Sequence, residues 1–165
     1  MISQILVNKL NFLFDQTDDF IDYEKLVVLF HRNPGATNEE IALMTSDKKQ
    51  KFPKDYINFL RKFNGCTLFT YQGLGGFELL GTASILKENN LQRLTYEDDW
   101  DNNLTVFCNV IGDGDFISFK NNEDDSYSII DCYHDDNPKN WKVISDSLDD
   151  FLNKLIAEKG KRFWL

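Results

Sequence analysis

Few side chains in the sequence have the types and spacing that nucleophilic or metal-assisted catalysis needs. The only histidines, His31 and His134, lie far apart in the chain, and no Gly-x-Ser-x-Gly motif presents a nucleophilic serine. Cys132 and His134 alternate along a predicted strand, so both would face one side and form half of a metal site. The alternative is a buried cysteine beside a surface histidine, which we favour.

Two other motifs resemble ligand-binding loops but lack the residues that bind the ligand. The glycine-rich stretch at residues 72–76 has no following Gly-Lys-Ser/Thr, so we interpret its glycines as turn residues. Asp99, Asp101 and Asn103 have the spacing of a calcium loop, but Leu104 and Val110 replace the required glycine and glutamate. We therefore predict no catalytic residue, no cofactor and no metal site, and a protein that is not an enzyme. Paired carboxylates for hydrolysis remain the alternative, because an acidic chain contains many.

Aromatic residues inside acidic loops indicate protein binding instead. Trp100 stands among three aspartates with Tyr96 nearby, a composition typical of a binding hot spot surrounded by charge. The alternative is a solvated loop with Trp100 inserted in the core. The predicted partner-binding residues are Tyr96, Asp98, Asp99, Trp100, Asp101, Glu123, Asp124, Asp125, Asp135 and Asp136.

The composition restricts the class of partner. The chain has 165 residues, enough for one domain, and a net charge of −9, which disfavours binding to nucleic acid or to an anionic membrane. A basic partner is compatible with this charge, although most acidic proteins have none. The amino terminus lacks a signal-peptide pattern, and three widely spaced cysteines fit reduced thiols. We expect a cytoplasmic protein.

The periodicity of apolar residues predicts the elements that position these loops. The clearest is a helix over residues 53–63, in which Tyr56, Phe59, Leu60 and Phe63 share one face, Pro53 takes the first helical position and residues 64–65 end the helix. Further helices are predicted over residues 2–14, 26–30, 37–44, 83–94 and 146–158; the second of these is a continuous apolar run for which a buried strand is the alternative. Leu91 is expected to face inward in the fourth of these.

The remaining segments predict strands over residues 67–71, 77–80, 105–111, 115–120, 126–133 and 141–144. A two-residue turn at Asp113 and Gly114 would join two of them as a hairpin. Strands and helices do not alternate regularly, so the sequence predicts an α+β fold with a mainly antiparallel sheet and helices packed on one face.

Five motifs in order resemble those of the SMI1/KNR4 family, also called the SUKH superfamily. They are GATNEEI (35–41), PKDYINFLRKFNG (53–65), FELLG (77–81), IGDGDF (111–116) and SLDDFL (147–152). The resemblance covers residues 34–158 and leaves residues 1–33 as an N-terminal helical extension of a single domain, residues 1–165. It implies the family's α+β fold.

The resemblance also implies a function. Bacterial members of the family resemble immunity proteins that neutralise polymorphic toxins, many of them nucleases, whereas fungal members act in the regulation of cell-wall synthesis. We therefore expect an immunity protein that occludes the active site of a cognate toxin, a basic nuclease. The alternative is a non-catalytic regulatory scaffold for an endogenous partner. The sequence leaves the oligomeric state open.

Overall fold

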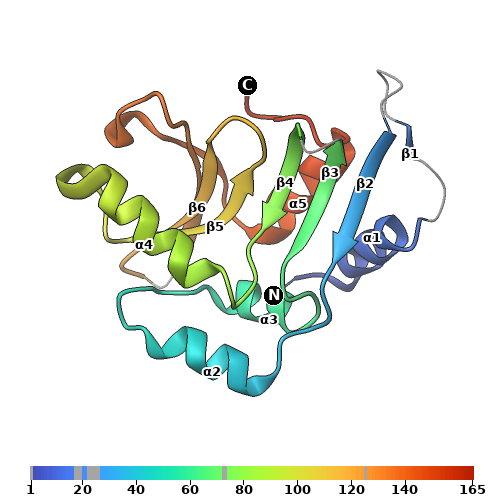
Figure 1. The fold of residues 1–165 in the computed structure, drawn as a ribbon, viewed down its shortest axis with the longest axis horizontal. Helices are drawn as coiled ribbons and strands as arrows, with labels where there is room; N and C mark the ends of the chain where they lie inside the picture. Colours follow the sequence, from blue (N-terminus) through green and yellow to red (C-terminus); the bar gives the residue numbers. More distant parts are fainter. Residues whose placement is uncertain (1, 17–19, 22–26, 72–73, 125) are drawn as a thin grey trace.

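The computed structural model describes residues 2–16, 20–21, 27–71, 74–124 and 126–165, in which helices surround one antiparallel sheet (Figure 1). Its strands are β1 (Phe20–Ile21), β2 (Val27–Arg32), β3 (Cys66–Tyr71), β4 (Gly75–Leu79), β5 (Leu104–Val110), β6 (Phe116–Asn121), β7 (Tyr127–Cys132) and β8 (Lys142–Ser145). The helices are α1 (Gln4–Phe14), α2 (Asn38–Ser46), α3 (Lys54–Leu60), α4 (Ile85–Tyr96) and α5 (Leu148–Ala157), with short 3₁₀ turns η1 (Glu97–Asp99) and η2 (Pro138–Asn140). Each strand pairs with the next one in sequence, which confirms the α+β class with an antiparallel sheet.

Helix α3 and helix α5 cover the same face of this sheet, as the sequence predicts. Tyr56 and Phe59 of α3 are fully buried, and Tyr56 packs edge-on against Phe107 of β5 and Phe119 of β6. Phe151 of α5 also packs edge-on against Phe107. The Tyr56 hydroxyl donates a hydrogen bond to the carbonyl of Leu80, which satisfies the polar end of a ring that is otherwise in an apolar environment.

The bounds of α3 differ slightly from the prediction. Pro53 precedes the helix with an extended ψ of 143°, so it is not the first helical residue, and α3 ends at Leu60. The predicted apolar face is nevertheless buried, because Phe63 still donates its backbone N–H to the Phe59 carbonyl and is only 3% exposed. The predicted stop at residues 64–65 lies beyond the helix: Gly65 takes a φ of +86°, a left-handed conformation that glycine adopts readily, directly before β3.

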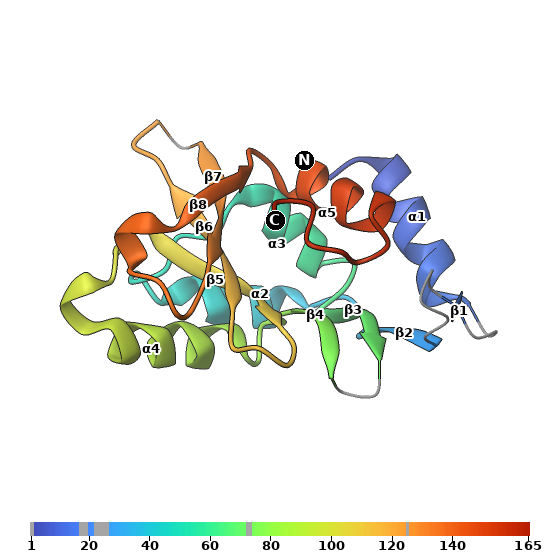
Figure 2. The same cartoon turned by 90° about the horizontal axis from the view of Figure 1, so that it is seen from above.

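Helix α4 lies on the other side of β5 and β6 (Figure 2). Its Asn89 is buried and completes the hydrogen bonding of β5 beyond the end of β4: the amide accepts from Val106 N at 2.7 Å and donates to Val106 O at 2.8 Å. The prediction that Leu91 faces inward is wrong, because this side chain is 52% exposed. The polar Asn89, rather than Leu91, occupies the buried face because it pairs with an open strand edge.

Two other local predictions need correction. The segment predicted as a helix at residues 26–30 is strand β2 from Val27 onward, and Leu26 lies outside the described residues. Its Leu29, His31 and Arg32 pair with β3, a tertiary contact that periodicity over five residues does not reveal. The β5–β6 hairpin is confirmed, but its loop spans residues 111–115 instead of two residues, closed by Val110 N donating to Asp115 O at 2.9 Å.

Both ends of the chain pack against α5, which lies on the same face of the sheet as α3. The predicted first helix is present as α1, where Ser3 caps the helix and donates its own backbone N–H to Asp149 of α5 at 2.6 Å. At the other end, Trp164 packs against Phe77 and Phe151, which explains the apolar tail. The division of the chain at residue 34 stays a prediction. Among the described residues no helix has the length and apolar composition needed to cross a membrane.

The three cysteines are buried with free thiols. Burial raises the pKa of each thiol, so Cys66, Cys108 and Cys132 stay protonated at neutral pH. Protonated thiols are poor nucleophiles and poor metal ligands. The cysteines therefore act as small apolar core residues.

Candidate partner-binding surface

A second aromatic cluster, on the α4 side of the sheet, organises the predicted partner-binding loops. Trp141, just before β8, packs edge-on against Tyr96 at the end of α4, with ring centroids 5.1 Å apart, and against Phe116 of β6 at 5.4 Å. Trp100, directly after η1, completes the cluster beside Phe116. The Trp141 indole also donates to the Tyr133 carbonyl at 3.0 Å. The segment after η1 and the segment before β8, which are far apart in sequence, are thus both held against β6.

Trp100 itself is not an exposed anchor. Only 8% of its surface is accessible, so the structure shows the alternative in which the tryptophan of the loop is inserted in the core. Its ring lies within 6.4 Å, centroid to centroid, of both Phe116 and Trp141. Trp100 therefore fixes the position of the residues on either side of it and leaves little of its indole accessible.

Exposed carboxylates beside this cluster come from η1 and from the β7–β8 connection, and we define them together as the acidic face: Glu97, Asp98, Asp99, Asp135 and Asp136. All five residues are exposed. Asp99 of η1 lies 3.9 Å from Lys139 of η2, which directly links the two connections. Burial raises the pKa of the Tyr96 hydroxyl, and the charges of Asp115 and Asp135 raise it further, so this phenol stays neutral beside the acidic face.

The other predicted residues lie elsewhere. Asp101 is paired with Lys120 at 3.1 Å and accepts a hydrogen bond from Asn103 N; burial opposes its ionisation, but these hydrogen bonds lower its pKa. Glu123 and Asp124 precede β7, whereas Asp135 and Asp136 follow it, so a whole strand separates the two groups. Asp125 lies outside the described residues. The partner-binding residues predicted from the sequence are therefore divided between the two ends of β7.

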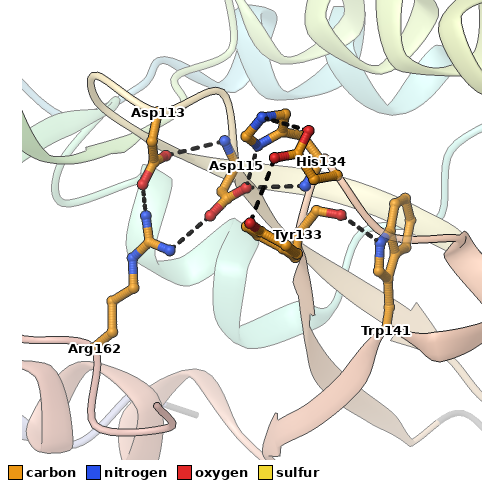
Figure 3. A network of polar contacts seen from close by, with 7 residues as sticks. Asp113, Asp115, Tyr133, His134, Trp141 and Arg162 are labelled. Carbon is orange, nitrogen blue, oxygen red and sulfur yellow. Dashed lines mark hydrogen bonds and ion pairs between the residues drawn. The ribbon is translucent and has the colours of Figure 1, made fainter.

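Next to the acidic face, a buried carboxylate joins three distant segments (Figure 3). Asp115, only 2% exposed, accepts from the backbone N–H of His134 at 2.9 Å and from its Nδ1 at 2.7 Å. The other Asp115 oxygen accepts from Arg162 at 2.6 Å, and Arg162 also pairs with Asp113. The network ties the β5–β6 hairpin to the β7–β8 connection and to the C-terminal tail.

His134 lies between two carboxylates. Its Nδ1 contacts Asp115, and its Nε2 lies 3.2 Å from Asp135 of the acidic face. The hydrogen bond to Asp115 is the main cause of a raised pKa at His134, since both ring nitrogens carry a proton only in the charged form. Protonated His134 therefore orients Asp135 while neutralising part of the local negative charge.

This network was not predicted from the sequence. The DGD sequence of the hairpin indicates a turn and is part of a family motif, but nothing local connects it to Arg162, which is 47 residues away from Asp115. For Cys132 and His134 the favoured interpretation, a buried cysteine beside a surface histidine, is confirmed. The Cys132 thiol donates to Ser118 at 3.4 Å, whereas His134 is held by Asp115. Within the described ranges, no group of three or more His, Cys, Asp or Glu residues is arranged to hold a metal ion.

Comparison with known proteins identifies one related family. The model of the SMI1 / KNR4 family (SUKH-1) matches residues 35–154. The matched range contains the sheet from β3 to β8, helices α2 to α4, most of α5 and the whole acidic face. None of the curated proteins compared with the chain matches it.

Proposed function

Because the chain belongs to the SMI1/KNR4 family, we propose that it is an immunity protein that binds and neutralises a cognate bacterial toxin. Membership of this family is consistent with such a role, since its members are generally non-catalytic immunity or regulatory proteins. We propose that this chain likewise acts without catalytic activity of its own and in the cytoplasm, where it would meet the toxin.

The acidic face is the observation that supports this proposal most directly. It brings together five exposed carboxylates from two connections, and their backbone is held in place by the buried rings of Trp100 and Phe116. Because these carboxylates are already held in place, binding does not have to order a mobile loop first, which would cost conformational entropy. Lys139 and His134 are the basic side chains that contact this face within the described residues, so it keeps a net negative charge.

A surface of this kind fits the basic active site of a nuclease. A nuclease binds phosphate groups through Lys and Arg side chains, and carboxylates on a rigid surface can occupy the same positions. Opposite charges also accelerate the encounter of the two proteins, which suits an inhibitor that must bind before the toxin damages the cell. We therefore propose that the acidic face covers the toxin's active site.

The test measures association with the toxin domain encoded next to the gene for this chain, by stopped-flow fluorescence at several salt concentrations. Asp98→Asn combined with Asp99→Asn is expected to slow association several-fold at low salt and to change dissociation much less, because charge acts on the encounter. The matched control, Asp146→Asn with Glu158→Gln, removes the same number of exposed charges elsewhere.

The outcomes separate the parts of the proposal. A toxin domain that does not bind the wild-type chain contradicts the immunity role and favours the regulatory-scaffold alternative. Binding that is equally sensitive to the test and control variants retains the role but moves the interface away from the acidic face.

A further inference from the structure

An apolar groove lies at the end of the molecule opposite the acidic face. It runs between α1 and the C-terminal end of α5, has a volume of about 530 Å³ and has Leu13, Phe69 and Ile156 among its apolar lining residues. Both ribbon views place α1 and α4 at opposite ends of the molecule, so this groove and the acidic face do not overlap (Figures 1 and 2).

The exposed side of α1 extends this apolar surface. Phe12 lines the groove and is 64% exposed, and Ile5, two helical turns earlier on the same side of the helix, is 68% exposed. Single exposed apolar residues are common on protein surfaces, but two large ones aligned beside an apolar groove form a patch of the kind that binds a partner.

The charge around the groove is the opposite of that of the chain as a whole. The chain carries a net charge of −9, yet the groove lining contains no carboxylate and two lysines, Lys9 and Lys159. Neither ammonium group lies within ion-pair distance of a carboxylate in the described ranges; Lys9 contacts only the amide oxygen of Asn153, at 2.7 Å. The groove thus combines an apolar floor with two positive charges that have no negative partner among the described residues.

The groove is also built mainly from segments outside the family match. Helix α1 and residues 156–159 lie outside the matched range of 35–154, and Phe69 is the groove residue inside it. Phe69 has a φ of +53°, a strained conformation for an aromatic residue, and its ring packs against Phe30 at 4.9 Å. With this backbone conformation, the Phe69 ring lines the groove together with α1 and residues 156–159.

We propose that this groove is a second docking site, for an acidic amphipathic segment of a partner protein. Apolar side chains of that segment would lie against Phe12, Leu13 and Phe69, and its carboxylates would pair with Lys9 and Lys159. The charge complementarity favours an acidic segment over a basic one. Because the site is remote from the acidic face, it would bind its partner while a toxin is bound, and the inference does not depend on the immunity role.

The experiment selects a random dodecapeptide phage library against the immobilised full chain and measures the affinity of the enriched peptides by fluorescence polarisation. Enriched peptides are expected to carry spaced apolar residues and net negative charge. Phe12→Ser, and separately Lys9→Glu with Lys159→Glu, should each raise the Kd of these peptides roughly tenfold or more, the effect of losing a central contact. These residues are exposed, so the variants should fold, which circular dichroism checks.

Matched controls come from α2 and the residues after it, where Leu43 is 72% exposed and Lys48 is also exposed. Leu43→Ser with Lys48→Glu should leave the Kd within about twofold. Enriched peptides that are basic, or that bind the Phe12→Ser variant unchanged, would overturn the proposal. Concentration-dependent dimerisation abolished by Phe12→Ser, or binding to phosphatidylserine vesicles abolished by the double lysine variant, would overturn it too, by assigning the groove to a second copy or to a lipid surface.

Discussion

The two aromatic clusters on opposite sides of the sheet are built from similar residues but serve different purposes. On the α3 side, Tyr56 and Phe59 are completely buried, and they come from a helix whose periodicity is visible in the sequence. On the α4 side, Tyr96 and Trp141 are partly exposed and lie at the end of α4 and just before β8, with carboxylates nearby in sequence. The comparison teaches that the first cluster stabilises the fold, whereas the second positions a charged surface.

The largest expected effect is the loss of a ring from the α3 cluster. Phe59→Ala should lower the free energy of unfolding by about 3 to 5 kcal/mol, because a fully buried aromatic leaves a cavity among rings that cannot move to fill it. Urea denaturation followed by circular dichroism measures this change. A loss below about 1 kcal/mol would mean that the two clusters do not differ in the way described.

Removing the buried ring of the second cluster should cost less. Trp100→Ala is expected to lower the free energy of unfolding by about 2 to 3 kcal/mol, because its neighbours Tyr96 and Trp141 are partly exposed and can relax into the space. Trp100→Phe, which keeps an aromatic ring, serves as the control and should recover much of the loss. If Trp100→Ala proved as costly as Phe59→Ala, the α4 cluster would belong to the main core.

A smaller effect is expected from the polar network beside the second cluster. Arg162→Met removes one partner of the buried Asp115 carboxylate and should cost about 1 to 3 kcal/mol of stability. Arg61→Met, at an exposed position, should stay within about 0.5 kcal/mol of wild type. Equal effects of the two substitutions would show that the tail is not held by this ion pair.

The smallest effect concerns pH. The pKa of His134 is raised in the folded protein, so its contribution to stability is complete below the unfolded value of about 6.5 and is lost as the pH rises through the folded value. Titration of the imidazole by NMR should give a pKa above about 6.5, and His134→Gln should reduce the dependence of stability on pH in this window. A folded-state pKa at or below the unfolded value would contradict the placement of the His134 ring between Asp115 and Asp135.

Local patterns predicted most of the elements but not their exact ends. The face of α3, the helices predicted over residues 37–44 and 146–158, and the hairpin near Gly114 each depend on residues close in sequence, and each is present. Strand β2 was only the alternative to a helix, because a short apolar run fits a helix or a strand equally well until its pairing partner is known. The inward position of Asn89 in place of Leu91 depends on an open edge of β5 that only the sheet creates.

The candidate site was predicted in composition and not in arrangement. The sequence by itself determined the acidic charge, the aromatic residues within acidic loops and the helical and strand segments, because these depend on residue type and local spacing. Only the tertiary structure decided that Trp100 is buried, that Asp99 lies near Lys139 of the β7–β8 connection, and that Arg162 reaches Asp115. These contacts join segments tens of residues apart, and their geometry is set by the register of the strands between them, which no local pattern specifies.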